Sequence, residues 1–173
     1  MGERDLFLAD PALLDECAEL LDLARERGLS LGTAESCTGG LVSACLTAVP
    51  GSSDVVRGGV VSYAVAVKRA VLGVSGEVLD DPALGAVSRE CAEQMAAGAR
   101  RVLGCDVAVS VTGIAGPGGA EPGKPVGTVW FGVSAPCGVS SRLELFAGGR
   151  DEVRHAAVRT AIRLLREAVM EKS

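Results

Sequence analysis

The sequence predicts an α/β protein in which helices cover a mostly parallel or mixed sheet. Segments with helical spacing of apolar residues alternate with short apolar runs, a pattern typical of layered α/β domains. Composition agrees, because 48% of the 173 residues are apolar but only 3% are aromatic, so small side chains must pack helices closely on strands. A single domain over 1–173 is expected, since domains cluster near ~100–150 residues.

Five helices are expected, over about 10–28, 41–49, 64–72, 88–103 and 151–170. In the first, Asp10 precedes a proline at the first turn, and Gly28 can end the helix. Ser88 is a suitable N-cap for the fourth helix, and Asp151 is expected to cap the last one. The domain is therefore expected to begin and end with a helix.

Five strands are expected between these helices, over 29–34, 55–63, 106–111, 128–133 and 140–146. The last two flank Pro136-Cys137-Gly138 and are predicted to pair antiparallel. The segment 113–127 is rich in glycine and proline and is predicted to be a long structured loop. Because α/β proteins bind ligands at the carboxyl ends of their strands, the turns that follow the strands are where a site is expected.

Charge and composition exclude several classes of protein. The formal net charge of −5 argues against a nucleic-acid-binding surface. No apolar run approaches the ~18–20 residues that cross a bilayer, and the first residues lack a signal-peptide pattern, so a cytoplasmic protein is expected. The six cysteines form no CxxC pair and His155 is the single histidine, which argues against a metal centre. We expect buried thiols in a reducing compartment.

The turn Glu35-Ser36-Cys37-Thr38-Gly39-Gly40 lies between an expected strand and an expected helix. Amides at a helix N-terminus favour an anion or a developing oxyanion. Ser36 is therefore a candidate nucleophile, and its neighbour Cys37 competes for that role. The structural alternative is that Ser36 or Thr38 only caps the helix.

Tyr63 and Lys68 form a second candidate group. A partly buried lysine can lose its proton and act as a base, which an arginine cannot do, and lysine is scarce in this chain. The alternative is a surface lysine on a helix.

The loop after the strand at 106–111 exposes backbone N–H groups that suit an anion. Its segment from Gly118 to Lys124 matches part of a P-loop, but Pro125 stands where Ser or Thr is required, so a P-loop ATPase is excluded. Before the last helix, Arg150 is a candidate clamp for a phosphate or carboxylate. His155 belongs to no catalytic motif, which weakens a Ser-His-Asp triad.

Taken together and in this order, the motifs resemble the CinA C-terminal domain family, the nicotinamide-nucleotide amidohydrolases. The resemblance covers about residues 10–170 and rests on Ala34-Glu35-Ser36-Cys37-Thr38-Gly39-Gly40, Val49-Pro50-Gly51-Ser52-Ser53, Gly58-Gly59-Val60-Val61-Ser62-Tyr63 with Lys68, Gly85-Ala86-Val87-Ser88, Thr112-Gly113-Ile114-Ala115-Gly116-Pro117-Gly118-Gly119, Lys124-Pro125-Val126-Gly127-Thr128-Val129, and Gly148 with Arg150. It implies a three-layer α/β/α domain with a mixed, mostly parallel sheet. The chain departs from many relatives at Ala64-Val65, where they carry Ser-Asn, and at Gly149, where they carry Asp.

The resemblance implies an enzyme that converts nicotinamide mononucleotide and water to nicotinate mononucleotide and ammonia. Ser36 would attack the carboxamide carbon, Lys68 would accept the hydroxyl proton, and Tyr63 would relay that proton or hold Lys68 in place. The residues expected to bind substrate are Thr38, Gly39, Thr112, Gly113 and Arg150. Among them, backbone amides would hold the oxyanion and Arg150 the phosphate.

The expected partner is thus a small-molecule substrate, with no nucleic acid, membrane, metal or organic cofactor, and a homo-oligomer is left open. Some relatives carry this domain behind a molybdopterin-binding-like domain that this sequence lacks, so a stand-alone deamidase is expected. The alternative is a non-catalytic nucleotide-binding or protein-interaction module of the same competence- and damage-associated family.

Overall fold

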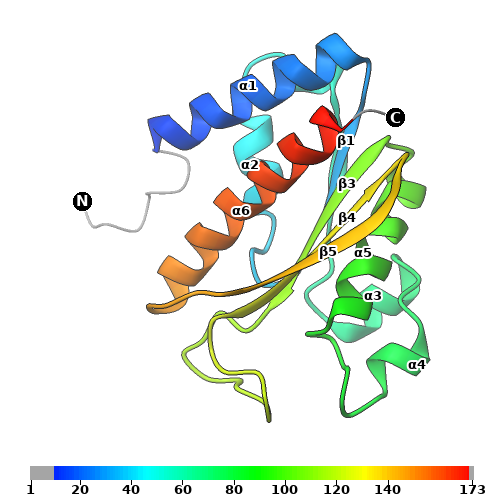
Figure 1. The fold of residues 1–173 in the computed structure, drawn as a ribbon, viewed down its shortest axis with the longest axis vertical. Coiled ribbons are helices and arrows are strands. Elements are labelled where there is room, and N and C mark those ends of the chain that lie inside the picture. The colour runs from blue at the N-terminus through cyan, green and yellow to red at the C-terminus, as the bar shows by residue number, and fades with distance from the viewer. Residues whose placement is uncertain (1–9, 172–173) are drawn as a thin grey trace.

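A computed structural model describes residues 10–171 and confirms the α/β class (Figure 1). Its sheet has the strand order β2-β1-β3-β4-β5. The strands are β1 (Leu31–Glu35), β2 (Val56–Val61), β3 (Val107–Gly113), β4 (Thr128–Ala135) and β5 (Gly138–Leu145). Strand β1 is parallel to both β2 and β3, whereas β4 is antiparallel to β3 and β5. The sheet is therefore mixed, and β4 alone opposes the direction of the other strands.

Helices cover both faces of the sheet, so the molecule has the expected three layers (Figure 1). One face carries α1 (Pro11–Arg27), α2 (Leu41–Thr47) and α6 (Arg150–Met170). The other carries α3 (Val65–Ala70), α4 (Gly76–Leu79) and α5 (Arg89–Leu103). Neither α4 nor the short 3₁₀ turn η2 (Ser52–Asp54) is predicted from the sequence, because each is too short to show a periodic pattern.

The helix ends follow local capping chemistry. The Asp10 side chain accepts hydrogen bonds from two backbone N–H groups of the first turn of α1, and Gly28 ends that helix with a φ of 65°. Ser88 caps α5 as expected. The expectation for the last helix is wrong, because α6 begins at Arg150 with the extended residue Gly149 as its N-cap. An N-cap must precede the helical residues, and Asp151 is already the second of them.

Small residues let α5 lie directly against its neighbours. A Cβ atom added to Gly98 would lie 2.0 Å from the carbonyl oxygen of Leu72, and one added to Gly132 of β4 would lie 2.2 Å from that of Ala92. Neither clash involves the end of a flexible side chain, so the backbone itself would have to move. Close approach of helix to sheet is what the aromatic-poor composition predicts, and it depends on Gly132, whereas Gly98 lets α5 approach the turn after α3.

We expect Gly98→Ala to lower the free energy of unfolding by about 1–3 kcal/mol, although alanine is the better helix former. The added methyl group has no space beside the Leu72 carbonyl. Urea unfolding measures the change as a lower midpoint with an unchanged m-value. Gly118→Ala is the matched control, because a Cβ there meets nothing within 4 Å. Equal midpoints for the two variants would contradict the close packing of α5.

Candidate active site

Ser36 directly follows β1 at the carboxyl edge of the sheet. Its backbone N–H donates to the carbonyl oxygen of Val111 at 2.9 Å, which extends the pairing of β1 with β3 by one residue. Ser36 is partly exposed, whereas its neighbours Glu35 and Cys37 are buried. The backbone therefore fixes the position of this hydroxyl and leaves it accessible.

Lys68 of α3 points back into the protein and meets Ser36. The residue is only 1% exposed. Its Nζ atom donates to the carbonyl oxygen of Ser62 at 2.6 Å and to the Ser36 hydroxyl at 2.9 Å. Burial lowers the pKa of Lys68 because desolvation disfavours the charged ammonium, while the thiols of Cys91 and Cys37 act in the opposite direction. Two of the predicted site residues, Ser36 and Lys68, are thus in direct contact, and the environment of the lysine favours loss of its proton.

Cys37 is poorly suited to act as the nucleophile. Its side chain is buried, and burial raises the pKa of the thiol to about 11. At neutral pH the group is therefore a thiol, and thiolate is the form that reacts. Of the two adjacent candidates, Ser36 is the one that is both accessible and in contact with a potential base.

Glu35 joins the end of β1 to the start of α2. Its carboxylate is fully buried and accepts hydrogen bonds from the backbone N–H groups of Gly40, Val42 and Ser43 at 2.8–3.0 Å. It also accepts from three hydroxyl groups, those of Thr33, Thr38 and Ser43. These amides form the N-terminus of α2, so the protein's own carboxylate already occupies the place at which the sequence suggests an anion site.

Two of the predicted substrate-binding residues are tied into this turn. The Thr38 hydroxyl donates to Glu35 at 2.7 Å, and Thr38 is fully buried. Gly39 has a φ of 64° and donates its N–H to the Ser36 carbonyl at 3.0 Å. Both residues therefore shape the loop around Ser36 through bonds within it.

Tyr63 and Arg150 contact each other. The Arg150 guanidinium donates to the Tyr63 hydroxyl at 3.4 Å and to the Gly116 carbonyl at 3.0 Å. Tyr63 is 62% exposed. Within residues 10–171, the hydrogen bond of its hydroxyl goes to Arg150 and not to Lys68, although the backbone of its neighbour Ser62 holds that lysine. Arg150 thus brings the Gly-rich loop and the segment after β2 together.

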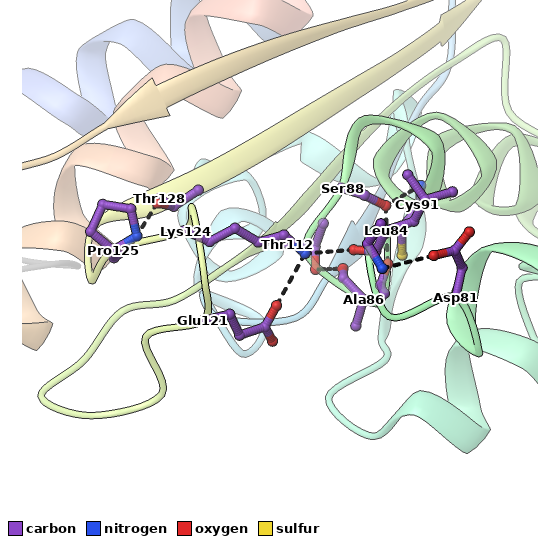
Figure 2. Close-up of polar contacts among 12 residues, drawn as sticks. Asp81, Leu84, Ala86, Ser88, Cys91, Thr112, Glu121, Lys124, Pro125 and Thr128 are labelled. Carbon is purple, nitrogen blue, oxygen red and sulfur yellow. Dashed lines mark hydrogen bonds and ion pairs between the residues drawn. The ribbon is translucent and has the colours of Figure 1, made fainter.

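Thr112 and Gly113 end β3 beside Ser36. The Thr112 hydroxyl donates to the Ala86 carbonyl at 2.7 Å, as Figure 2 shows. Ile114, the residue after Gly113, donates its N–H to the carbonyl oxygen of Thr128 in β4. Because backbone N–H groups alternate between the two sides of a strand, the N–H of Gly113 lies on the other side, toward β1 and the Ser36 turn. Gly113 is therefore the residue of this pair with a backbone donor directed at the site.

The Gly-rich loop is attached to the segment before α5 by Lys124 (Figure 2). Its Nζ atom donates to the Leu84 carbonyl at 2.6 Å and pairs with Glu121 at 3.0 Å. Lys124 thus has a structural role here, which agrees with the exclusion of a P-loop.

The structure adds Arg154 to the site, a residue that sequence reasoning did not assign. From α6 it donates to the carbonyl oxygens of Cys37 and Thr38 at 3.2 and 3.3 Å, and so holds the turn that carries Ser36. Its spacing of four from Arg150, which places both on one helix face, is the signal that could have found it. The single histidine, His155, instead faces Asp10, with 3.4 Å between Nε2 and Oδ2.

Among residues 10–171, no group of three or more His, Cys, Asp or Glu side chains is arranged to hold a metal ion. The six cysteines all lie in this range and form no disulfide with one another, and Cys137 is the exposed one. No helix in the same range is long and apolar enough to span a bilayer.

Comparison with known proteins gives one consistent result. The family model of the CinA C-terminal domain matches residues 15–169. A CinA-like protein of Mycolicibacterium vanbaalenii is 47% identical over 168 residues, which are 96% of this chain and 38% of that protein. One of an Anaeromyxobacter strain is 49% identical over 157 residues, 90% of this chain and 38% of that protein. The chain thus spans little more than a third of the length of these curated relatives.

Solved structures agree with the sequence relatives. The competence damage-inducible protein A of Klebsiella pneumoniae superposes with a TM-score of 0.88 at 37% identity, covering 93% of this chain and 99% of its own. The competence/damage inducible protein of Agrobacterium tumefaciens gives a TM-score of 0.86 at 43% identity, covering 92% and 96%.

We expect Glu35→Gln to lower the free energy of unfolding by about 2–4 kcal/mol, because a neutral amide offers one acceptor oxygen to a site built of buried donors. Denaturant unfolding measures the loss. Glu26→Gln, an exposed substitution on α1, is the control and should change stability by less than about 0.5 kcal/mol. If both variants unfold at the wild-type midpoint, the carboxylate does not hold β1 to α2.

Proposed function

Because the chain belongs to the CinA C-terminal domain family, we propose that it is an amidohydrolase that converts nicotinamide mononucleotide and water to nicotinate mononucleotide and ammonia. The observation that carries this proposal is the 2.9 Å contact between the buried Lys68 amine and the partly exposed Ser36 hydroxyl. A hydroxyl needs a base beside it to attack an amide, and Lys68 is a base that can be neutral in this environment.

In the proposed reaction, neutral Lys68 accepts the hydroxyl proton while Ser36 Oγ attacks the carboxamide carbon. The carbon–nitrogen bond of the resulting tetrahedral species then breaks. Lys68 gives the proton to the departing nitrogen, so that ammonia leaves and an acyl-enzyme remains. Water then attacks the acyl carbon, and one of its protons passes through Lys68 to Ser36 Oγ as the bond between that oxygen and the acyl carbon breaks. The acid that is released gives its remaining proton to solvent and becomes the carboxylate product.

The developing oxyanion needs donors near Ser36. The N–H groups at the start of α2 already donate to Glu35, so they are not available to the oxyanion. The N–H of Gly113, at the end of β3, remains as a backbone donor directed at Ser36. A backbone donor of this kind is typically worth ~2.7–4 kcal/mol in the activation barrier. We therefore assign Gly113, rather than the helix N-terminus, to the oxyanion.

The phosphate end of the substrate is assigned to Arg150. This residue is exposed, and its bonds to Gly116 and Tyr63 leave further N–H donors of the guanidinium for a ligand. Tyr63 lies against it with an exposed ring, so we place the tyrosine on the substrate side of the site, where it can relay a proton when substrate is bound. Arg154 is a positioning residue, since it acts by holding the Ser36 turn.

The first test separates Ser36 from Cys37. Ser36→Ala should lower the rate of ammonia release from nicotinamide mononucleotide by about a thousandfold or more, because the attacking atom is lost. Cys37→Ala should retain most of the activity, because a buried thiol with a pKa of about 11 is not the attacking group. The reverse order would assign the chemistry to the thiol. Tight binding of the nucleotide by the wild type without ammonia release would instead identify a non-catalytic binding module.

The second test addresses the base. Lys68→Arg keeps the charge but removes a titratable amine, so kcat should fall by ~10²–10⁴-fold. In the wild type, kcat/KM should rise with pH as Lys68 loses its proton. The midpoint of this rise should lie below the ordinary lysine pKa of ~10.4, because burial lowers the pKa of Lys68.

The matched control is Arg69→Lys, a neighbouring and exposed position on α3, which should leave kcat and the pH profile unchanged. A Lys68→Arg variant that folds like the wild type and keeps more than about a tenth of its kcat would show that the lysine is only an electrostatic aid.

A further inference from the structure

Strand β5 forms an open edge of the sheet. Its inner side pairs with β4 along the whole strand, and within residues 10–171 no strand pairs with its outer side. Phe146, just beyond the strand, donates its N–H inward to Gly127. Since the direction alternates along a strand, the N–H and C=O groups that point outward belong to residues 139, 141, 143 and 145.

This edge has little of the usual protection against pairing. Exposed edges are normally blunted by proline, by charged side chains and lysine above all, by bulges or by a short strand, and the two charges of β5, Arg142 and Glu144, are of opposite sign. Strand β5 contains neither proline nor lysine and pairs with β4 in continuous register over Gly138–Leu145. The opposite edge of the sheet differs, because β2 contains Gly58 with a φ of 144° and shifts register against β1.

The exposed apolar side chains of β5 lie on one face. Val139, Leu143 and Leu145 are 50%, 50% and 66% exposed. They share the α5 face with Ser141, which bonds to Glu93 of that helix. The charged residues Arg142 and Glu144 alternate onto the α6 face, where Arg142 lies 4.0 Å from Glu167.

From these observations we propose that β5 pairs antiparallel with β5 of a second copy of the chain, about a two-fold axis at Leu143, to form one continuous sheet across a dimer. The outward groups of Leu143 then bond to those of Leu143 in the second copy, and Ser141 bonds to Leu145. This register uses the outward-pointing backbone groups that β5 leaves open.

Charge complementarity selects this register. With the axis at Leu143, Arg142 faces Glu144 of the second copy, and symmetry repeats the pair. These residues occupy non-hydrogen-bonded positions, where facing side chains approach most closely. An axis at Arg142 would place Arg142 opposite Arg142 of the second copy, and an axis at Glu144 would place Glu144 opposite Glu144, and like charges directly opposite are destabilising.

Apolar contact adds to the pairing on the other face. Leu143 is directly opposite Trp130 of β4, which is partly exposed. In the dimer, Trp130 and Leu143 of both copies would form a row of four across the joined sheet, withdrawing exposed apolar surface from water. Trp130 is the single tryptophan of the chain, so its fluorescence reports on this row.

The test is sedimentation velocity on the full chain from micromolar to near-millimolar concentration. The wild type should reach a mass twice that of the 17.5 kDa chain, with a concentration-dependent change in tryptophan emission. Arg142→Glu and Glu144→Arg should each raise the dimer dissociation constant by about ten- to a hundredfold, because each turns two attractive pairs into repulsive ones. The double exchange, Arg142→Glu with Glu144→Arg, should restore dimerisation.

Arg163→Glu is the control for a general effect of charge on α6, and it should leave the dissociation constant unchanged. A wild type that stays monomeric throughout would overturn the proposal. So would a dimer that both single exchanges leave intact, or a double exchange that fails to restore dimerisation while unfolding at the wild-type denaturant midpoint. Leu143→Lys tests the axis independently of these pairs: it should abolish the dimer, because it places two ammonium groups face to face.

Discussion

The arrangement of the candidate site depends on the buried carboxylate of Glu35. A buried charge is costly unless hydrogen bonds compensate for it, and the N-terminus of α2 supplies that compensation. The same bonds fix how the chain leaves β1 and enters the helix. Ser36 lies in the connection, so the position of its hydroxyl relative to the sheet is determined by an interaction in which the hydroxyl takes no part.

The neighbours of β1 complete that arrangement. On one side, β3 accepts the Ser36 N–H at Val111 and ends in Gly113. On the other, β2 leads to Ser62, whose carbonyl holds Lys68 against Ser36. Because β1 lies between two parallel neighbours, its carboxyl end is the place where a hydroxyl, an amine and a backbone donor from three separate segments can meet. Arg154 and Arg150 then connect α6 to the same edge.

Much of the secondary structure could be predicted from residues close together in the sequence, whereas contacts between distant segments could not. Asp10 and Gly28 define α1 because capping is decided within a few residues. Gly149 rather than Asp151 caps α6, because Gly149 is the last residue with an extended backbone and Asp151 already lies in the first turn. The pairing of Ser36 with Lys68 followed from a family resemblance, and neither spacing nor composition implies it. Two further contacts depend on side-chain positions that only the folded chain specifies. They are the hydrogen bonds of the α2 amides to Glu35 and the hydrogen bond of Arg150 to Tyr63.

The burial of Lys68 also connects the site to the stability of the whole molecule. Its pKa is lower in the folded chain than the value of ~10.4 expected in the unfolded chain, so between these two values the unfolded chain binds more protons. The free energy of unfolding therefore rises with pH across this window, and the gain is lost as the pH falls through the folded-state pKa. A buried amine that can take a proton is thus a position at which the fold gives up stability below that window, in the way that functional sites commonly cost stability.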